Sequence, residues 1–195
     1  MSKAVMLSIR PKWCEKICSG EKTIEVRKTR PKLETPFKVY IYCTLPKYPH
    51  EDFIATDYPK PQFYGGGKVI GEFTCDRIDW ITHIGYTGIP NLVETRICDA
   101  ATMRTSPTGG LLNAACLTPK MMNDYLAGGD GYGWHISDLS IYDQPQKLTE
   151  FRRSCPNDLY CEACAMYSNN NGICNNGALP LRRPPQSWCY VEEDT

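Results

Sequence analysis

The sequence predicts an α+β fold, a small mixed β-barrel with two or more short helices and long loops. Three observations lead to this prediction. Several segments alternate apolar and polar residues, two short segments have apolar residues at helical spacing, and long stretches rich in Gly and Pro separate them. With 42% apolar residues in 195, the chain can bury a core, and we expect a single domain over residues 1–195.

The first helix is predicted to begin at Pro11 and to end before Gly20. Proline has a φ angle that suits the first helical position, and Trp13 and Ile17 recur at the i, i+4 spacing of one helical face. Gly20 then ends the helix, because glycine readily adopts the left-handed conformation found at helix C-termini. After this turn the apolar period changes from helical to alternating.

A strand is therefore predicted to follow the turn. Ile24 and Val26 point to one side of it, which we expect to face the core, whereas Thr23, Glu25 and Arg27 point to the other. Reactive and charged side chains are thus presented together beside a turn.

Four further segments alternate strongly enough to predict strands. They are residues 38–44, 68–78, 133–142 and 181–191. Glu72 lies within the second of these segments. In the third, the apolar parity slips near Asp138, as a β-bulge would cause.

Two long segments show no sustained period. Residues 45–67 are predicted to form a surface loop, and residues 79–117 an irregular excursion with one short helix near 91–97. A firmer helix follows, with Thr118 as its N-cap, a proline at its first position and Gly128 beyond its end.

The charge balance limits the possible partners. The formal net charge is zero, which argues against a protein that coats nucleic acid by bulk electrostatics. The net charge does not reveal a local basic strip, because acidic residues elsewhere in the chain offset it. Candidate segments for such a strip are residues 27–32, 152–153 and 182–183. Each of them, taken singly, is typical of a solvated turn. We find neither an apolar run of about 18 residues nor a charged-then-apolar leader, so we expect a cytoplasmic protein with no membrane partner.

Nine of the eleven cysteines fall into two groups. One group occupies apolar patterns and is predicted to be core: Cys14, Cys18, Cys43, Cys75 and Cys116. The other lies in a Cys-rich insertion over residues 155–176, where a cluster in a reducing compartment is more often a metal site than a disulfide framework.

Four thiolates of the insertion are predicted to hold a structural zinc ion. They are Cys155, Cys161, Cys164 and Cys174. The alternatives are a disordered insertion with free thiols, a redox role for the Cys-x-x-Cys pair, and a segment that recruits a protein partner. We expect no organic cofactor, and the sequence does not set the oligomeric state.

The segment from Gly20 to Arg27 carries a longer motif, G-x-K-x-x-E-x-R, with Lys22 and Glu25 at its lysine and glutamate positions. Together with the preceding helix, it resembles the signature of the ASCH family, a branch of the PUA-like β-barrel superfamily. Residues 68–73 resemble the second block of that family, and the C-terminal strand is similar to the tail of its larger bacterial and phage-type members. The resemblance implies a domain that holds RNA, or a modified nucleoside or nucleotide, in a cleft at the barrel mouth.

The resemblance also indicates which residues line the cleft. Lys22, Glu25 and Arg27 are expected on one wall and Glu72 on the far wall. His135 is a further ligand-binding candidate that can orient a ligand or act as a general base, although a single strand histidine is more often structural. From the residues alone, Lys22, Glu25 and Arg27 are equally compatible with an ion-paired network that only fixes the helix to the strand.

An enzyme is the alternative function. Some small ASCH members remove the acyl group from N4-acylated cytidine with a lysine, a threonine and a glutamate. Carried over to this sequence, the lysine is Lys22 and the strand glutamate is Glu72. The position three past the lysine is Glu25, and the nearby threonine is Thr23. The alternative is therefore an amidohydrolase of this kind, or a ribonuclease-type hydrolase that uses Lys22 and Glu72.

Aromatic residues offer two interpretations. Trp13, Trp134 and Trp188 have strand or helix spacing that is typical of a core, but they are also able to stack on bases. The better stacking candidates are Tyr48, Tyr58 and Tyr64, because they lie in a segment with neither helical nor strand periodicity.

Overall fold

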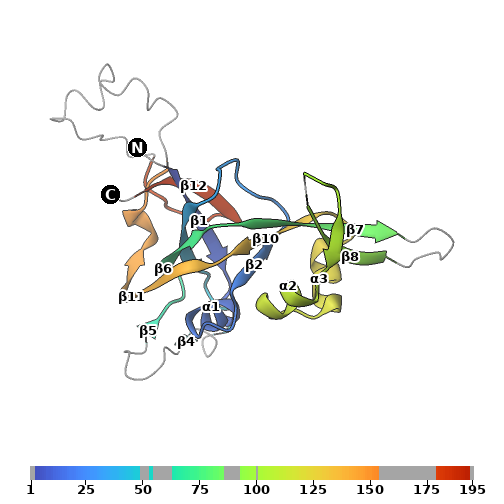
Figure 1. Cartoon of the computed structure of the whole chain (residues 1–195). Helices are drawn as coiled ribbons and strands as arrows, with labels where there is room; N and C mark the ends of the chain where they lie inside the picture. Colours follow the sequence, from blue (N-terminus) through green and yellow to red (C-terminus); the bar gives the residue numbers. More distant parts are fainter. Residues whose placement is uncertain are drawn as a thin grey trace, which may run out of the picture.

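The computed structural model describes residues 3–48, 53–54, 63–85, 93–99, 101–153 and 179–193. Within them, two five-stranded sheets, one two-stranded sheet and three α-helices confirm the α+β class (Figure 1). The described strands form open sheets and no closed barrel. None of the described helices is long and apolar enough to cross a membrane.

The first sheet carries most of the core. Its strands follow the order β11 (Ser137–Lys147), β6 (Lys68–Cys75), β3 (Phe37–Cys43), β1 (Lys3–Ile9) and β12 (Trp188–Glu192). Only the β1–β3 pair is parallel within this sheet. Val39 and Ile41 pack on one face with the helix α1 (Pro11–Cys18), while Tyr40 packs on the other face with Phe151 and Leu181. Both faces of this sheet are therefore covered.

The second sheet supports the remaining helices. Its order is β2 (Ile24–Arg27), β10 (Gly131–His135), β7 (Ile78–Gly85), β8 (Val93–Cys98) and β9 (Thr105–Pro107). Helices α2 (Gly109–Ala114) and α3 (Pro119–Leu126) cover one face, where Ile24 and Val26 pack against Leu111 and Met122. The predicted inward orientation of Ile24 and Val26 is confirmed. A short hairpin of β4 (Phe53–Ile54) and β5 (Phe63–Tyr64) and a 3-10 turn, η2 (Leu148–Glu150), complete the described elements.

The helices predicted after Arg10 and after Thr118 begin and end as expected. Proline stands at the first turn of α1, and Gly20 beyond it has a φ of 77°. The Thr118 hydroxyl accepts a hydrogen bond from the backbone nitrogen of Met121 at 3.2 Å, which caps α3. Gly128, with a φ of 80°, follows the end of that helix.

The helix expected near residues 91–97 is wrong over its described part, because β8 occupies residues 93–97 and pairs with β7 along its whole length, while residues 91–92 lie outside the described residues. Val93, Thr95 and Ile97 are β-branched residues at every second position, a pattern that fits a pleated strand once a neighbouring strand is available. The segment from 79 to 117 also contains most of the second sheet and α2, so it is more regular than predicted.

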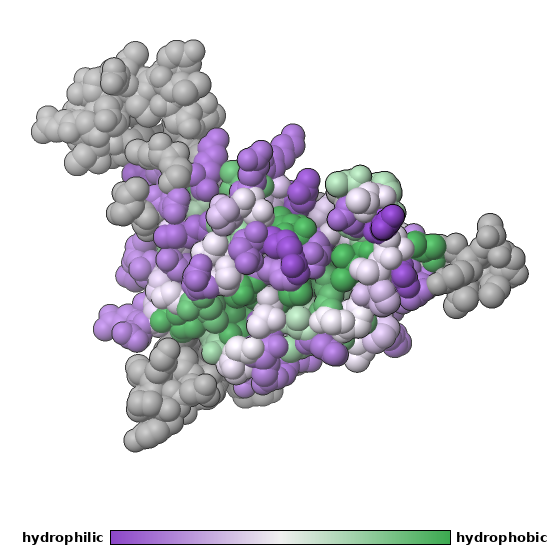
Figure 2. Space-filling view, viewed as in Figure 1, coloured by the Kyte–Doolittle hydropathy of each residue, from purple (hydrophilic) through white to green (hydrophobic). Residues whose placement is uncertain are grey.

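The expected strand over 133–142 is divided between the two sheets. The change of sheet falls at Ile136, between β10 in the second sheet and β11 in the first. Asp138, within β11, adopts a φ of 47°, and the register of β11 against β6 shifts between Ser137 and Ser140. The irregularity predicted near Asp138 is therefore confirmed. Figure 2 shows hydrophilic side chains over much of this view, with hydrophobic ones gathered toward its centre.

Candidate functional site

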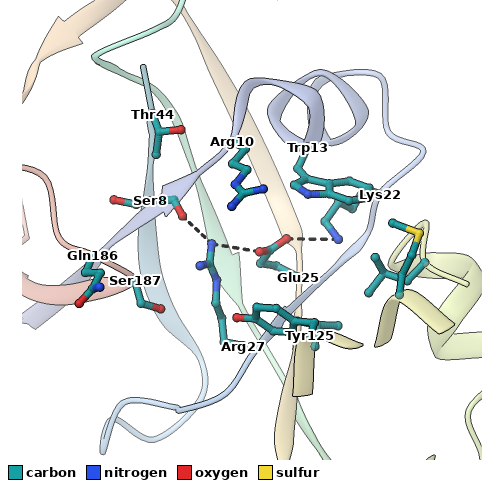
Figure 3. A pocket seen from close by; sticks show the side chains of 13 residues that line it. Ser8, Arg10, Trp13, Lys22, Glu25, Arg27, Thr44, Tyr125, Gln186 and Ser187 are labelled. Carbon is teal, nitrogen blue, oxygen red and sulfur yellow. Dashed lines mark hydrogen bonds and ion pairs between the residues drawn. The ribbon is translucent and has the colours of Figure 1, made fainter. Parts of the chain in front are cut away.

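A cavity of about 430 Å³ lies where α1, β2 and α3 approach the ends of β1 and β3 (Figure 3). Its lining comes from five separate parts of the chain: Ser8, Arg10, Trp13, Lys22, Glu25, Val26, Arg27, Thr44, Leu117, Met121, Tyr125, Gln186 and Ser187. The structure thus brings together Lys22, Glu25 and Arg27, which the sequence places on one wall of a cleft.

The base of the cavity is a row of three charges. The Glu25 carboxylate accepts from Lys22 Nζ, 3.2 Å from its Oε2, and from an Arg27 terminal nitrogen, 3.0 Å from its Oε1. The Lys22 and Glu25 side chains retain only 2% and 8% of their exposure, and Arg27 retains 11%. Two cations therefore face one buried carboxylate, and removing any of the three side chains would leave a buried charge without one of its partners.

Backbone carbonyls fix both cations. Lys22 Nζ donates to the carbonyl of Ala115, at the C-terminus of α2, at 2.8 Å. It also lies 5.0 Å from the ring centroid of Trp13. The same Arg27 nitrogen donates to the carbonyl of Ser8 at 2.6 Å. The three side chains are therefore preorganised by α2, α1 and β1.

The cavity carries a positive excess. Lys22, Arg27 and the exposed Arg10 face a single carboxylate, Glu25. The buried Arg27 Nε has no acceptor among the described residues. On the rim, Tyr125 is 40% exposed and Trp13 is partly exposed. Such a site suits a planar ligand with acceptor or anionic groups and at least one donor for Glu25.

The two interpretations of this charge row are thus compatible. Lys22, Glu25 and Arg27 do form an ion-paired network that joins β2 to α2 and β1. The same atoms form the base of the cavity, so structural support and ligand contact involve the same side chains.

Glu72 does not lie in this cavity, and its expected position on the far wall is wrong. It stands opposite Tyr40 in the β3–β6 pair, on the outer face of the first sheet. There it pairs with Lys38 at 3.3 Å and accepts from the Tyr142 hydroxyl at 2.7 Å. Its neighbour Phe73 points to the face that holds α1. Strand alternation therefore directs Glu72 away from Lys22.

Thr23 and His135 lie at a different cavity, also of about 430 Å³. His135 Nε2 is 2.8 Å from Asp79 Oδ2 and 2.9 Å from an Arg77 nitrogen. Burial raises the pKa of Asp79, but the hydrogen bond from His135 and the charges of His135 and Arg77 outweigh it and hold that pKa below its usual range. His135 therefore belongs to a partly buried polar cluster, apart from Lys22.

Sequence reasoning missed most of the cavity wall. Ser8, Thr44 and Ser187 are single polar residues at the ends of strands or in loops, and Met121 and Tyr125 belong to the exposed side of α3. None of them carries a local pattern. The only sequence signal was indirect, in that α3 has apolar residues off its buried face.

The remaining predicted residues have mixed outcomes. Trp134 is fully buried, while Tyr48 and Tyr64 are exposed. Three core cysteines are buried as expected, Cys14, Cys43 and Cys75, whereas Cys18 and Cys116 are partly exposed. Burial raises the pKa of Cys75 to about 12. Tyr58 and the four proposed zinc ligands, Cys155, Cys161, Cys164 and Cys174, lie outside the described residues, which themselves contain no cluster that would hold a metal.

The fold of this chain is similar to that of a solved ASCH protein. The chain is similar, over 97% of its length and 89% of the other chain, to the crystal structure of a point mutant of the ASCH protein of Zymomonas mobilis, with a TM-score of 0.51 and 18% identity. The crystal structure of ASCH from the same organism gives a TM-score of 0.46 and 17% identity over 97% and 88% of the two chains. No family model and no curated protein matches the sequence. The resemblance noted from the G-x-K-x-x-E-x-R motif is thus supported in the fold.

Proposed function

We propose that the cavity between α1, β2 and α3 binds RNA or a modified nucleoside or nucleotide. The observation that carries this proposal is the Glu25 carboxylate, held at the base of the cavity between Lys22 and Arg27. Carboxylates accept hydrogen bonds from exocyclic amines such as N4 of cytosine, and nearby cations suit base carbonyls or phosphates.

Glu25 has acceptor capacity left for a ligand. An ionised carboxylate offers about four lone-pair sites, and the ion pairs with Lys22 and Arg27 use two of them. Glu25 lines the cavity together with Trp13 and Tyr125, so we expect a base stacked on either ring to bring its polar edge toward the carboxylate. The cavity volume of about 430 Å³ falls in the range of small-molecule sites.

Hydrolysis of N4-acylated cytidine or of RNA remains the alternative. The residue set expected for it, Lys22 with Thr23 and Glu72, is distributed over two cavities and the opposite face of a sheet. The geometry therefore favours binding, and a turnover assay decides between the two functions.

The binding test titrates the protein with nucleosides, nucleoside monophosphates and short RNA by calorimetry. We compare wild type with Lys22→Ala, in which Glu25 keeps its ion pair with Arg27. The control variant is Glu72→Gln, which removes a carboxylate outside the cavity. We expect saturable binding that Lys22→Ala weakens at least roughly tenfold and Glu72→Gln leaves unchanged. Equal binding by the folded Lys22→Ala variant would refute the cavity assignment.

The same proteins are incubated with N4-acetylcytidine and RNA oligomers. Product formation that is lost in Lys22→Ala would identify an enzyme, whereas saturable binding without product supports the proposed reader of nucleosides or RNA.

A further inference from the structure

A cationic strip follows β2, in the loop that leads to β3 (Figure 1). The side chains of Lys28, Arg30 and Lys32 are exposed, whereas Pro31 is buried and Leu33 packs against the core. Because exposed cations alternate with anchored apolar residues, the strip presents its charges on one side of a docked segment.

The strip is held by β12. Trp188 Nε1 donates to the Thr29 hydroxyl at 2.9 Å, and the Tyr190 hydroxyl accepts from the backbone nitrogen of Lys32 at 2.8 Å. The residues joined by these two contacts are 159 and 158 positions apart in the sequence. The backbone of the strip is thus fixed before any partner arrives, which lowers the entropic cost of binding.

The charges of the strip are not neutralised locally. Among the described residues, no carboxylate lies within 4.0 Å of the Lys28, Arg30 or Lys32 nitrogens. Arg30 and Lys32 also border a depression of about 640 Å³, where Glu34 is the one carboxylate among the described lining residues. A formal net charge of zero for the chain therefore conceals a local positive surface.

Tyr125 connects the strip to the cavity at Glu25. It lines the cavity, and Lys28 Nζ lies 5.5 Å from its ring centroid. The Arg30 guanidinium carbon lies 5.8 Å from the ring centroid of Tyr132, which packs against the core. Two cations of the strip thus lie beside aromatic rings, one of which belongs to the cavity. Sites for single-stranded nucleic acid combine these two features, because cations follow the phosphates while rings stack on bases.

We propose that the strip of Lys28, Arg30 and Lys32 binds the phosphodiester backbone of a single-stranded polynucleotide, one base of which enters the cavity at Glu25. This inference rests on the proposed function and makes it more specific, since it requires a polymer and not a free nucleoside. A nucleoside has no phosphate, so it would contact the cavity alone.

The test measures fluorescence anisotropy of labelled RNA and DNA strands, from trimers to dodecamers, beside calorimetry with nucleosides. The variant replaces Lys28, Arg30 and Lys32 by Ala. Its control replaces three exposed lysines of the first sheet, Lys3, Lys68 and Lys147, by Ala and so removes the same charge. We expect affinity that rises with strand length and a roughly tenfold loss in the strip variant alone. The slope of log affinity against log salt should become shallower by about 2, because single strands contribute about 0.7 for each phosphate contact.

Each outcome has a separate meaning. Unchanged nucleoside binding with weakened oligomer binding in the strip variant supports the proposal, and the RNA and DNA arms then show which sugar is preferred. Equal oligomer binding by the strip and control variants overturns the strip and leaves the cavity proposal standing. If oligomers bind in a way that depends on the strip but nucleosides do not bind at all, the proposal that the cavity holds a base is overturned. Absence of binding to every oligomer overturns the strip proposal.

Discussion

Lys22 Nζ and Glu25 Oε2 lie 3.2 Å apart in a setting where both side chains are almost fully buried. They are three positions apart in the sequence, yet the carbonyl that completes the environment of Lys22 belongs to Ala115, 93 positions further along the chain. The pair therefore couples the first helix-to-strand unit to α2, and its stability depends on that tertiary contact.

Glu25→Gln should destabilise the protein more than Lys22→Met does. The first change leaves two buried cations without their carboxylate, at an expected cost of about 3 kcal/mol in the free energy of unfolding. The second leaves Glu25 paired with Arg27 and costs about 1–2 kcal/mol, mainly for the Ala115 carbonyl that loses its donor. Urea unfolding of both variants measures the order, and equal losses would show that Arg27 is not an effective partner.

Gly71→Ala should be strongly destabilising. A Cβ at this position would overlap the Ser140 carbonyl oxygen in the β6–β11 pair, so a strand must shift, at a cost of roughly 1–3 kcal/mol or more. The matched control is Gly110→Ala in α2, where a Cβ meets nothing within 4 Å and a better helix former is introduced. Thermal unfolding should show a lower midpoint for the first variant and an unchanged or higher one for the second.

Asp79→Asn should remove part of the acid sensitivity of the fold. The pKa of Asp79 is lowered in the folded state, because His135 and Arg77 outweigh the opposing effect of burial. The ionised form therefore contributes stability that is fully present above the unfolded pKa, about 3.9, and is lost as pH falls through the lower folded pKa. Between pH 2 and 6, the free energy of unfolding should depend less on pH in Asp79→Asn than in wild type, because the variant lacks the carboxylate, which takes up about one proton on unfolding in acid. Parallel curves for the two proteins would contradict this assignment.

The insertion over residues 155–176 should bind about one zinc ion per chain through its four cysteines. Elemental analysis of the purified chain measures the metal, and serine at both Cys161 and Cys164 should abolish it. The control is Cys18→Ser, which changes a partly exposed thiol at the last residue of α1. If wild type and the double variant contain equally little zinc under metal-replete conditions, the insertion holds free thiols.

The sequence alone was enough to predict the helix, turn and strand from Pro11 to Arg27. The φ preferences of proline and glycine and the change of apolar period are local properties, and the structure has α1, Gly20 at positive φ and β2 in that order. Capping by Thr118 is equally local, and α3 begins as predicted. Strand 93–98 was not accessible in this way, because its β-branched alternation becomes decisive only beside β7.

The sequence by itself determined that Glu25 and Arg27 share one side of β2 and that Ile24 and Val26 share the other, since a strand directs alternate side chains to opposite sides. Strand parity does not place Lys22, which precedes β2 and is held beside Glu25 by the carbonyl of Ala115. Only the tertiary structure decided what faces them. Glu72 lies on the outer face of the first sheet, and Thr23 and His135 line a second cavity. The wall opposite Lys22, Glu25 and Arg27 is formed by residues of α3 and by residues 186–187. The physical reason is that the alternation of side chains along a strand determines only which side of that strand each one points to. Which residues lie across a cavity from it depends on how the sheets and helices pack.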